Sequence, residues 1–155
     1  MRSRLVLFVL VASAASAQTI PPRGGDTTFD VGTWNIQQFG DPAPSTLPDA
    51  AQLRNAAALL SQSRIDLWAV QEITTHEVWQ ALLGRRRSSG YAGVLSPEPT
   101  FGNMKIGFLY DSTVVSVISA QRPIPITGSF GGHQPFELHA RVVVGVGRDG
   151  GLDAG

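Results

Sequence analysis

The chain has 155 residues, no cysteine, and 12 acidic against 12 basic side chains. A chain without cysteine excludes a disulfide scaffold and a zinc site built on thiolates. Zero formal net charge removes any overall attraction to nucleic acid or to an anionic membrane, so partners have to be inferred from local sites. The length favours one modest domain.

The first 17 residues have the pattern of a signal peptide. Two arginines precede an apolar run at 5–11, and small residues at 15–17 match the sequence after which a signal peptidase cuts. The apolar run is too short to stay as a membrane anchor. We therefore predict cleavage after Ala17, export to the periplasm or the extracellular space, and a flexible lead at 18–28. The alternative is a buried N-terminal helix.

Segment 29–36 is rich in β-branched and aromatic residues, which predicts a strand with Asn35 near its carboxyl end. Prolines and a Gly-Asp-Pro sequence at 37–48 indicate a loop. A helix opened by a capping box is expected at 49–63. Its predicted buried face consists of Ala50, Leu53, Ala57 and Leu60.

The apolar run at 65–73 predicts a strand buried on both faces. Asp66 lies at its start, where we expect the carboxylate to be near water, and Glu72 lies at its end. The order strand, helix, strand makes a βαβ unit, whose two strands run parallel. If these strands are neighbours, Asn35 and Glu72 meet at the edge where open α/β sheets bind ligands.

A second helix is predicted after a capping box that runs from Thr74 to Glu77, with an apolar face that ends at Leu83 and with Gly84 as terminator. Three arginines follow at 85–87. We expect them to form a solvated helix end that complements the helix dipole. The alternative is a patch that contacts phosphate.

The rest of the chain predicts a β-meander followed by a disordered tail at 147–155. The four expected strands are 91–96, 104–110, 114–120 and 136–146. In the last strand alternation predicts a covered face with Phe136, Leu138, Ala140, Val142 and Val144, and a wetter face with Glu137, His139 and Arg141.

Three short stretches together resemble a known family. They are Thr-Trp-Asn-Ile-Gln-Gln-Phe-Gly at 33–40, Asp-Leu-Trp-Ala-Val-Gln-Glu-Ile at 66–73, and the strand at 105–110 followed by Asp111. In order and spacing they resemble the endonuclease/exonuclease/phosphatase superfamily, and the first is closest to its deoxyribonuclease I branch. The resemblance implies an α/β fold, a two-sheet β-sandwich with outer helices, of which 29–146 would supply a part.

The resemblance also implies an exported, divalent-metal-dependent phosphodiesterase, with a nuclease first among the candidates. Glu72 matches the metal-binding glutamate of the family, and Asn35 matches its asparagine in the shell of the metal and phosphate. Lys105 and Arg141 are candidate phosphate contacts. The implied cofactor is Mg²⁺, or else Mn²⁺ or Ca²⁺, and the implied partner is nucleic acid or another phosphodiester. A phosphatase or a phospholipid phosphodiesterase of the same superfamily is the enzymatic alternative.

Without the resemblance, the residues leave other interpretations open. Glu72 could be a strand-end glutamate paired with an arginine, and Asn35 an amide that caps neighbouring backbone. The three histidines, His76, His133 and His139, fit surface or rim positions better than the role of a base. A non-enzymatic exported α/β domain that binds a partner through an uncovered sheet face is the second class of function.

The sequence also departs from the family pattern. The catalytic histidine, the Asp-x-Asn motif and the terminal Asp-His pair of the family have no match here. Met104 or Lys105 stands where the deoxyribonuclease branch has a supporting glutamate. We therefore expect a fold truncated after its first half and a chain that is inactive on its own.

Overall fold

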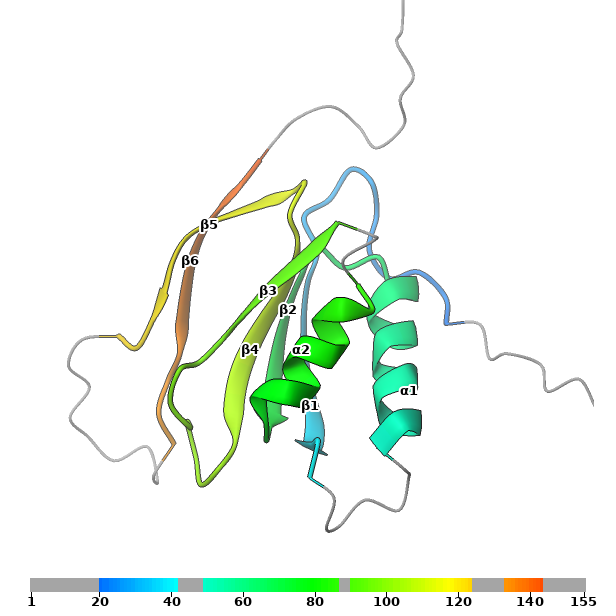
Figure 1. The fold of residues 1–155 in the computed structure, drawn as a ribbon. Coiled ribbons are helices and arrows are strands. Elements are labelled where there is room, and N and C mark those ends of the chain that lie inside the picture. The colour runs from blue at the N-terminus through cyan, green and yellow to red at the C-terminus, as the bar shows by residue number, and fades with distance from the viewer. Residues whose placement is uncertain (1–19, 42–48, 87–89, 124–132, 144–155) are drawn as a thin grey trace, which may run out of the picture.

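The computed structural model describes residues 20–41, 49–86, 90–123 and 133–143 (Figure 1). The predicted signal peptide at 1–17 and the predicted tail at 147–155 lie outside the described residues, as does most of the expected loop at 37–48. Within the described ranges, no helix combines the length and the apolar character needed to cross a membrane.

The described residues form a mixed α/β fold with two sheets, as expected from the sequence. In chain order the elements are β1 (Val31–Phe39), α1 (Asp49–Gln62), β2 (Leu67–Ile73), α2 (His76–Gly84), β3 (Tyr91–Leu95), β4 (Lys105–Asp111), β5 (Val115–Gln121) and β6 (Glu137–Val142). The first sheet has the order β1-β2-β4-β3, and β5 and β6 pair in a second sheet. Figure 1 shows both helices on one side of the first sheet and the β5-β6 pair on the other.

The predicted βαβ unit is confirmed. β1 and β2 are parallel neighbours, with Val31 opposite Leu67 and Asn35 opposite Gln71. β1 runs three residues beyond the predicted end, to Phe39, because an irregular turn of the backbone lets it rejoin β2 opposite Ile73. This parallel pair brings the carboxyl ends of both strands to the same edge of the sheet.

The helices cover the first sheet with one hydrophobic core. Burial along β2 alternates, with Trp68, Val70 and Ile73 fully inside, so the strand is buried on one face and only half-buried on the other. The prediction of burial on both faces was wrong there. On α1 the buried face includes Ala56 and Leu60, whereas Ala50 is exposed.

The indole of Trp79 on α2 reaches the sheet because two strands carry glycine beneath it. A Cβ atom added at Gly93 on β3 would lie 2.7 Å from the Trp79 ring, and one added at Gly107 on β4 would lie 2.8 Å from it. Such separations are too short for ordinary carbon contacts, so any larger residue would have to displace the indole. These glycines therefore set how closely α2 approaches the sheet.

α2 begins one residue later than the predicted capping box. Thr75 is the N-cap, and its hydroxyl accepts a hydrogen bond from the backbone N–H of Val78 at 3.2 Å. Thr74 instead donates through both its backbone N–H and its hydroxyl to the carbonyl of Phe39. This second role ties the end of β2 to the end of β1, so the local sequence pattern missed it.

The expected single β-meander is divided between two sheets. β4 lies between β2 and β3 and is antiparallel to both, so β5 has no place beside it and starts a second sheet with β6. Phe136 is buried and stacks on Phe108 of β4, with ring centroids 5.6 Å apart. Further along β6, Ala140 and Val142 are exposed, so the covered face predicted for that strand ends near its start.

Asp66 is buried, with 2% of its surface exposed, against the prediction that it would stay near water. Its carboxylate accepts a hydrogen bond from the backbone N–H of Asp30 at 2.9 Å. The backbone carbonyl of Asp30 accepts from the N–H groups of Asp66 and Leu67, and the carbonyl of Asp66 accepts from Asp111. The carboxylate is therefore part of the frame that aligns three strands at their shared end.

Arg86 is also buried, with 5% exposed, so the prediction of three solvated arginines was wrong for it. Its guanidinium lies 4.3 Å from the centroid of the Tyr91 ring, a cation–π arrangement. Burial lowers the pKa of Arg86 below its ordinary value, and the nearby Tyr91 and Asp111 oppose that effect. Arg85 is exposed as expected, and Arg87 lies outside the described residues.

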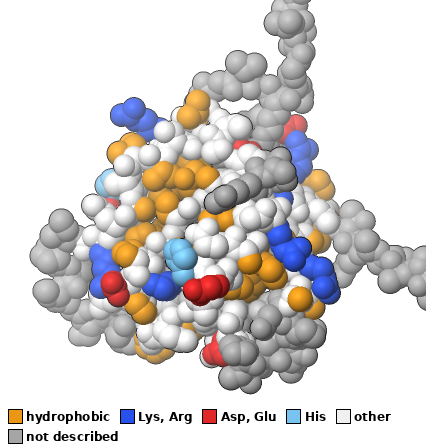
Figure 2. Space-filling view, viewed as in Figure 1, with side chains coloured by type: hydrophobic (Ala, Val, Ile, Leu, Met, Phe, Trp, Pro, Cys, Tyr) orange, Lys and Arg blue, Asp and Glu red, His pale blue; other side chains and the backbone are white. Residues whose placement is uncertain are grey.

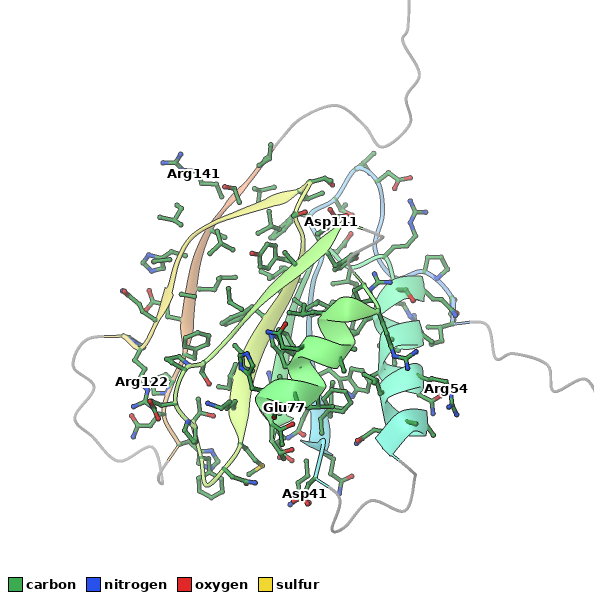
Figure 3. The ribbon with its side chains drawn as sticks, in the orientation of Figure 1. Asp41, Arg54, Glu77, Asp111, Arg122 and Arg141 are labelled. Carbon is green, nitrogen blue, oxygen red and sulfur yellow. The ribbon has the colours of Figure 1, made fainter. Side chains whose placement is uncertain are left out.

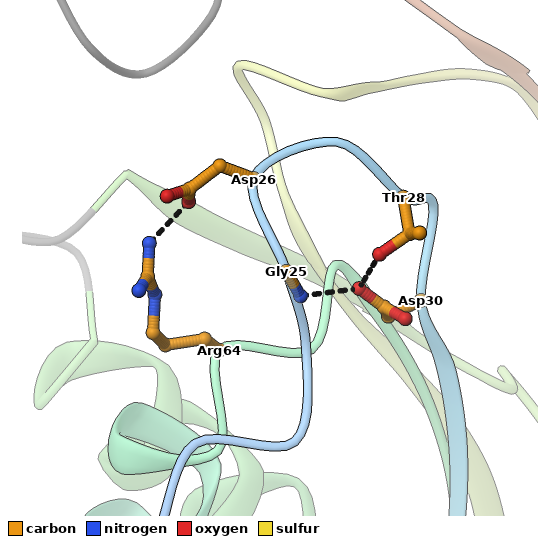
Figure 4. A network of polar contacts seen from close by, with 5 residues as sticks. All are labelled: Gly25, Asp26, Thr28, Asp30 and Arg64. Atoms are coloured by element: carbon orange, nitrogen blue, oxygen red, sulfur yellow. Dashed lines mark hydrogen bonds and ion pairs between the residues drawn. The ribbon is translucent and has the colours of Figure 1, made fainter.

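Residues 20–28, most of the expected flexible lead, are hydrogen-bonded to the rest of the fold. The N–H groups of Arg23 and Gly24 donate to the carbonyl of Ser63, which α1 leaves without an intrahelical partner. Arg64 pairs with Asp26, and Asp30 accepts from Gly25 and Thr28 (Figure 4). The carbonyls at a helix end need donors, and this segment supplies them.

Candidate functional site

The carboxyl ends of β1 and β2 form an irregular edge, which we call the Glu72 edge and define by Asn35, Gln37, Gln38 and Glu72. The regular pairing of β1 with β2 breaks between Asn35 and Phe39. Gln37, Gln38 and Glu72 have φ angles of 41°, 51° and 62°. Residues other than glycine enter this left-handed region at a cost of order 1 kcal/mol each, and they stay there only where their surroundings enforce it. The strain here coincides with the predicted site.

The Glu72 carboxylate is held at both of its oxygens. Oε1 accepts from the Asn35 side-chain amide at 2.6 Å, and Oε2 accepts from the backbone N–H of Gln38 at 3.1 Å. The left-handed turn at 37–38 directs that N–H toward β2, so the unusual backbone conformation produces the hydrogen bond to Glu72. Among the described residues, no arginine or lysine forms an ion pair with Glu72. The interpretation of Glu72 as half of a salt bridge therefore has no support.

Asn35 connects the two strands at this edge. Its Oδ1 accepts from the Gln37 backbone N–H at 2.8 Å, while its Nδ2 donates to Glu72. One partner is a donor and the other a carboxylate, so the orientation of the amide is fixed by its neighbours. Asn35 thus caps neighbouring backbone, as one of the two interpretations expected, and it also holds the Glu72 carboxylate.

Lys105 lies beside the Glu72 edge but its ammonium is occupied. Residue 105 is the register partner of Ile73, next to Glu72. Its Nζ donates to the carbonyls of Ser96 at 3.2 Å and Pro97 at 2.5 Å. The side chain thus holds the loop before β4 and carries positive charge at this end of the sheet.

Arg141 is not brought to the Glu72 edge. It pairs in register with Ser116, near the start of β5, and β5 starts at the end of the sheet where β2 begins. Figure 3 shows Arg141 and Asp111 at one end of the molecule, and Asp41 and Glu77 at the other. Its placement therefore gives no support to a phosphate contact shared with Glu72.

The histidines are at the surface, as the sequence suggested. His76 starts α2 and contacts Gln80 at 3.2 Å. His139 pairs with Glu137 on the outer face of β6. His133 is exposed and stacks on Phe101.

A family model described as the Endonuclease/Exonuclease/phosphatase family matches residues 32–149. The chain belongs to this family. The matched region starts in β1 and includes the whole Glu72 edge. Among curated protein sequences, none matches the chain significantly.

A solved structure of the human Nocturnin catalytic domain with bound sulfate anion is similar to the chain, with a TM-score of 0.44 and 17% identity. The match covers 72% of this chain and 44% of that one. The chain thus spans less than half the length of the solved structure that it matches.

Members of the Endonuclease/Exonuclease/phosphatase family generally use divalent metal ions, and the Glu72 edge fits such an ion. A carboxylate offers about four lone-pair positions, and hydrogen bonds from the described residues occupy two of those of Glu72. Magnesium favours one or two carboxylates completed by water and substrate phosphate. No group of three or more His, Asp or Glu side chains occurs in the described ranges, so an all-protein cage of that kind is not formed there.

Sequence reasoning missed the backbone N–H of Gln38 as a hydrogen-bond partner of Glu72. Glutamine has no particular preference for the left-handed region, so nothing in the local sequence marks this turn. The turn is evident only from the pairing register of the two strands, because β1 has to accommodate more residues than β2 before Phe39 pairs with Ile73.

Proposed function

We propose that the chain supplies the metal-binding part of an exported, divalent-metal-dependent phosphodiesterase whose substrate is nucleic acid. The observation that carries the proposal is the Glu72 carboxylate, held by Asn35 and by the strained backbone of Gln38 at an accessible strand end. Two donors that fix a carboxylate without neutralising it preorganise a ligand for a cation. Membership of the Endonuclease/Exonuclease/phosphatase family supports the same chemistry.

In this account each residue has a separate task. Glu72 would hold the divalent cation, with Mg²⁺ first and Mn²⁺ or Ca²⁺ as alternatives. The cation would neutralise charge on the phosphoryl oxygens and polarise the phosphate. Asn35 fixes the orientation of the carboxylate, as the outer partners of metal ligands commonly do. Lys105 adds positive charge to this end of the sheet.

The proposal is tested by calorimetric titration of the intact chain with MgCl₂ and MnCl₂. Glu72→Gln keeps the shape of the side chain and its contact with Gln38 but removes the charge, and we expect affinity to fall at least about tenfold. Glu77→Gln is the matched control, because Glu77 is exposed in the first turn of α2 at the same end of the molecule (Figure 3). Equal isotherms for the wild type and Glu72→Gln would contradict the proposal.

The second candidate is a domain that binds a protein partner through an uncovered sheet face. Val31 and Ile118 are 62% and 61% exposed, and Figure 2 shows apolar side chains together on one face of the molecule. Large exposed apolar patches mark interaction surfaces. Under this alternative Glu72 is structural, so Glu72→Gln would leave metal titration unchanged, which is the outcome that separates the two candidates.

A phosphatase or a phospholipid phosphodiesterase remains the alternative substrate class within the family. All three substrates present phosphate to the same metal, so the Glu72 edge does not separate them. Only a contact with the non-phosphate part of the substrate can do so.

A further inference from the structure

Two exposed rings from different loops are stacked near the Glu72 edge. The ring centroids of Phe101 and His133 are 4.0 Å apart, and the ring planes differ by 9°. Phe101 is 41% exposed, and His133 is exposed as well. Aromatic rings contribute much of the binding energy at interfaces, so a stacked pair that is open to solvent suggests a binding surface.

The fold holds this pair in place. Phe101 forms an isolated bridge with Met104, and the Thr100 N–H donates to the Met104 carbonyl at 2.7 Å. The second loop is attached to the first, because the Gln134 N–H donates to the Thr100 carbonyl at 2.7 Å. The backbone next to each of the two rings therefore takes part in a hydrogen bond. Such a platform loses little freedom when a ligand binds.

The stacked pair lies at the same end of the sheet as Glu72. Met104 leads directly into Lys105, which is opposite Ile73 in the β2–β4 register. Summing two cross-strand pairs and two chain steps puts the Cα atoms of Phe101 and Glu72 within about 18 Å of each other. A short oligonucleotide with a phosphate at Glu72 can reach that far.

The charges around the stacked pair are mixed but include two cations. Arg122 donates from Nη2 to the Pro99 carbonyl at 2.9 Å, and Lys105 donates to the Pro97 carbonyl. Glu98, in the same loop, is exposed and acidic. Two cations beside exposed rings resemble the combination with which proteins hold single strands, in which the rings take bases and the cations take phosphates.

We propose that Phe101 and His133 form a stacking surface for a base of single-stranded nucleic acid whose phosphate lies at the Glu72 edge. The inference rests on the proposed function and supplies the contact with the non-phosphate part of the substrate. Every base has a flat face, so such a surface favours nucleic acid of any sequence. A phospholipid headgroup offers no aromatic ring, and the ring of an inositol phosphate is saturated and not flat, so neither can stack as a base does.

The test measures binding of the intact chain to a fluorescent 12-residue oligothymidylate by anisotropy, in EDTA and at fixed low salt. An abasic strand of equal length and charge is the comparison ligand. We expect the wild type to bind the thymidylate at least about fivefold more tightly than the abasic strand. Phe101→Ala and His133→Ala should each remove that preference, and Phe101→Trp should retain it.

Phe29→Ala is the matched control, because Phe29 is equally exposed, at 41%, but precedes β1 at the opposite end of the sheet. It should bind both strands as the wild type does. Equal binding of the two strands by the wild type, or an unchanged preference in both Phe101→Ala and His133→Ala, would overturn the inference. EDTA removes the metal, so either result leaves the separate test of Glu72 as a metal ligand unaffected.

Discussion

The two ends of the β1–β2 pair carry similar carboxylates in opposite settings. At the end where β2 begins, Asp66 is buried and its carboxylate accepts a hydrogen bond from the backbone of Asp30, each residue lying directly before a strand. At the other end, Glu72 is only half-buried and is held by two donors on distorted backbone. The comparison shows that burial marks the structural carboxylate here, since a left-handed residue occurs near both ends, Arg64 with a φ of 58° among them. Partial exposure is what distinguishes Glu72, the carboxylate that we propose binds a cation.

The largest expected effect on stability lies at the Asp66 end, where Arg86 packs over Tyr91. Arg86→Ala should lower the free energy of unfolding by about 3 kcal/mol, because it removes a buried cation from beside Asp111 and leaves a gap over the ring. Arg85→Ala is the matched control and should change stability by less than about 0.5 kcal/mol. Urea unfolding followed by tryptophan fluorescence measures the stability of both variants. A loss of stability in Arg86→Ala no larger than that in Arg85→Ala would show that Arg86 is not a structural group.

Asp66→Ala should cost about 2 kcal/mol, because the N–H of Asp30 would lose its acceptor inside the protein. Asp66→Asn keeps an acceptor of the same shape and should cost less. Metal affinity should stay at the wild-type value in both variants. A loss of metal affinity in a folded Asp66→Asn protein would end the distinction between the two ends.

Asn35→Ala should have the reverse profile, with a stability loss of about 1 kcal/mol or less, since its hydrogen bonds are near the surface. Metal affinity should fall about tenfold or more because Glu72 loses one of its two holding groups. Calorimetry and urea unfolding on the same preparation give both values. Wild-type metal affinity in this variant would show that Asn35 does not position Glu72.

The smallest expected effect is that of Gln38→Gly. Glycine adopts a φ of 51° without strain but loses more freedom on folding, so the two terms nearly cancel and stability should change by less than about 1 kcal/mol. The backbone N–H to Glu72 is retained, so metal affinity should be unchanged. Gln38→Val cannot adopt that φ easily and should lower both stability and metal affinity. Equal behaviour of the two variants would show that the turn at Gln38 does not matter.

The convergence of Asn35 and Glu72 could be predicted from the sequence, because the two strands of a βαβ unit run parallel. When such strands are neighbours, their carboxyl ends lie at the same edge of the sheet. The roles of Asp66 and Arg86 could not be predicted. Asp66 depends on Asp30, which is 36 residues away. Arg86 depends on a ring presented by β3.

The turn at Gln37 and Gln38 was equally hidden, for a different physical reason. Its conformation follows from the pairing of Phe39 with Ile73, because between the regular pairing and this pair β1 has more residues than β2. Propensity and periodicity describe residues near each other in the chain, whereas register is set by tertiary packing. The residue types of the site could therefore be identified from the sequence, but not the backbone donor that completes it.

The central claim is that the Glu72 end, and not the Asp66 end, binds the metal. Paramagnetic broadening by Mn²⁺ in the ¹H–¹⁵N spectrum of the intact chain tests it at both ends in one measurement. We predict that substoichiometric Mn²⁺ broadens the amide signals of Asn35, Gln38 and Glu72 and leaves those of Asp30, Asp66 and Asp111 sharp, and that Glu72→Gln removes the effect. Broadening centred on Asp66, or broadening at the Glu72 edge that persists in Glu72→Gln, would contradict the account.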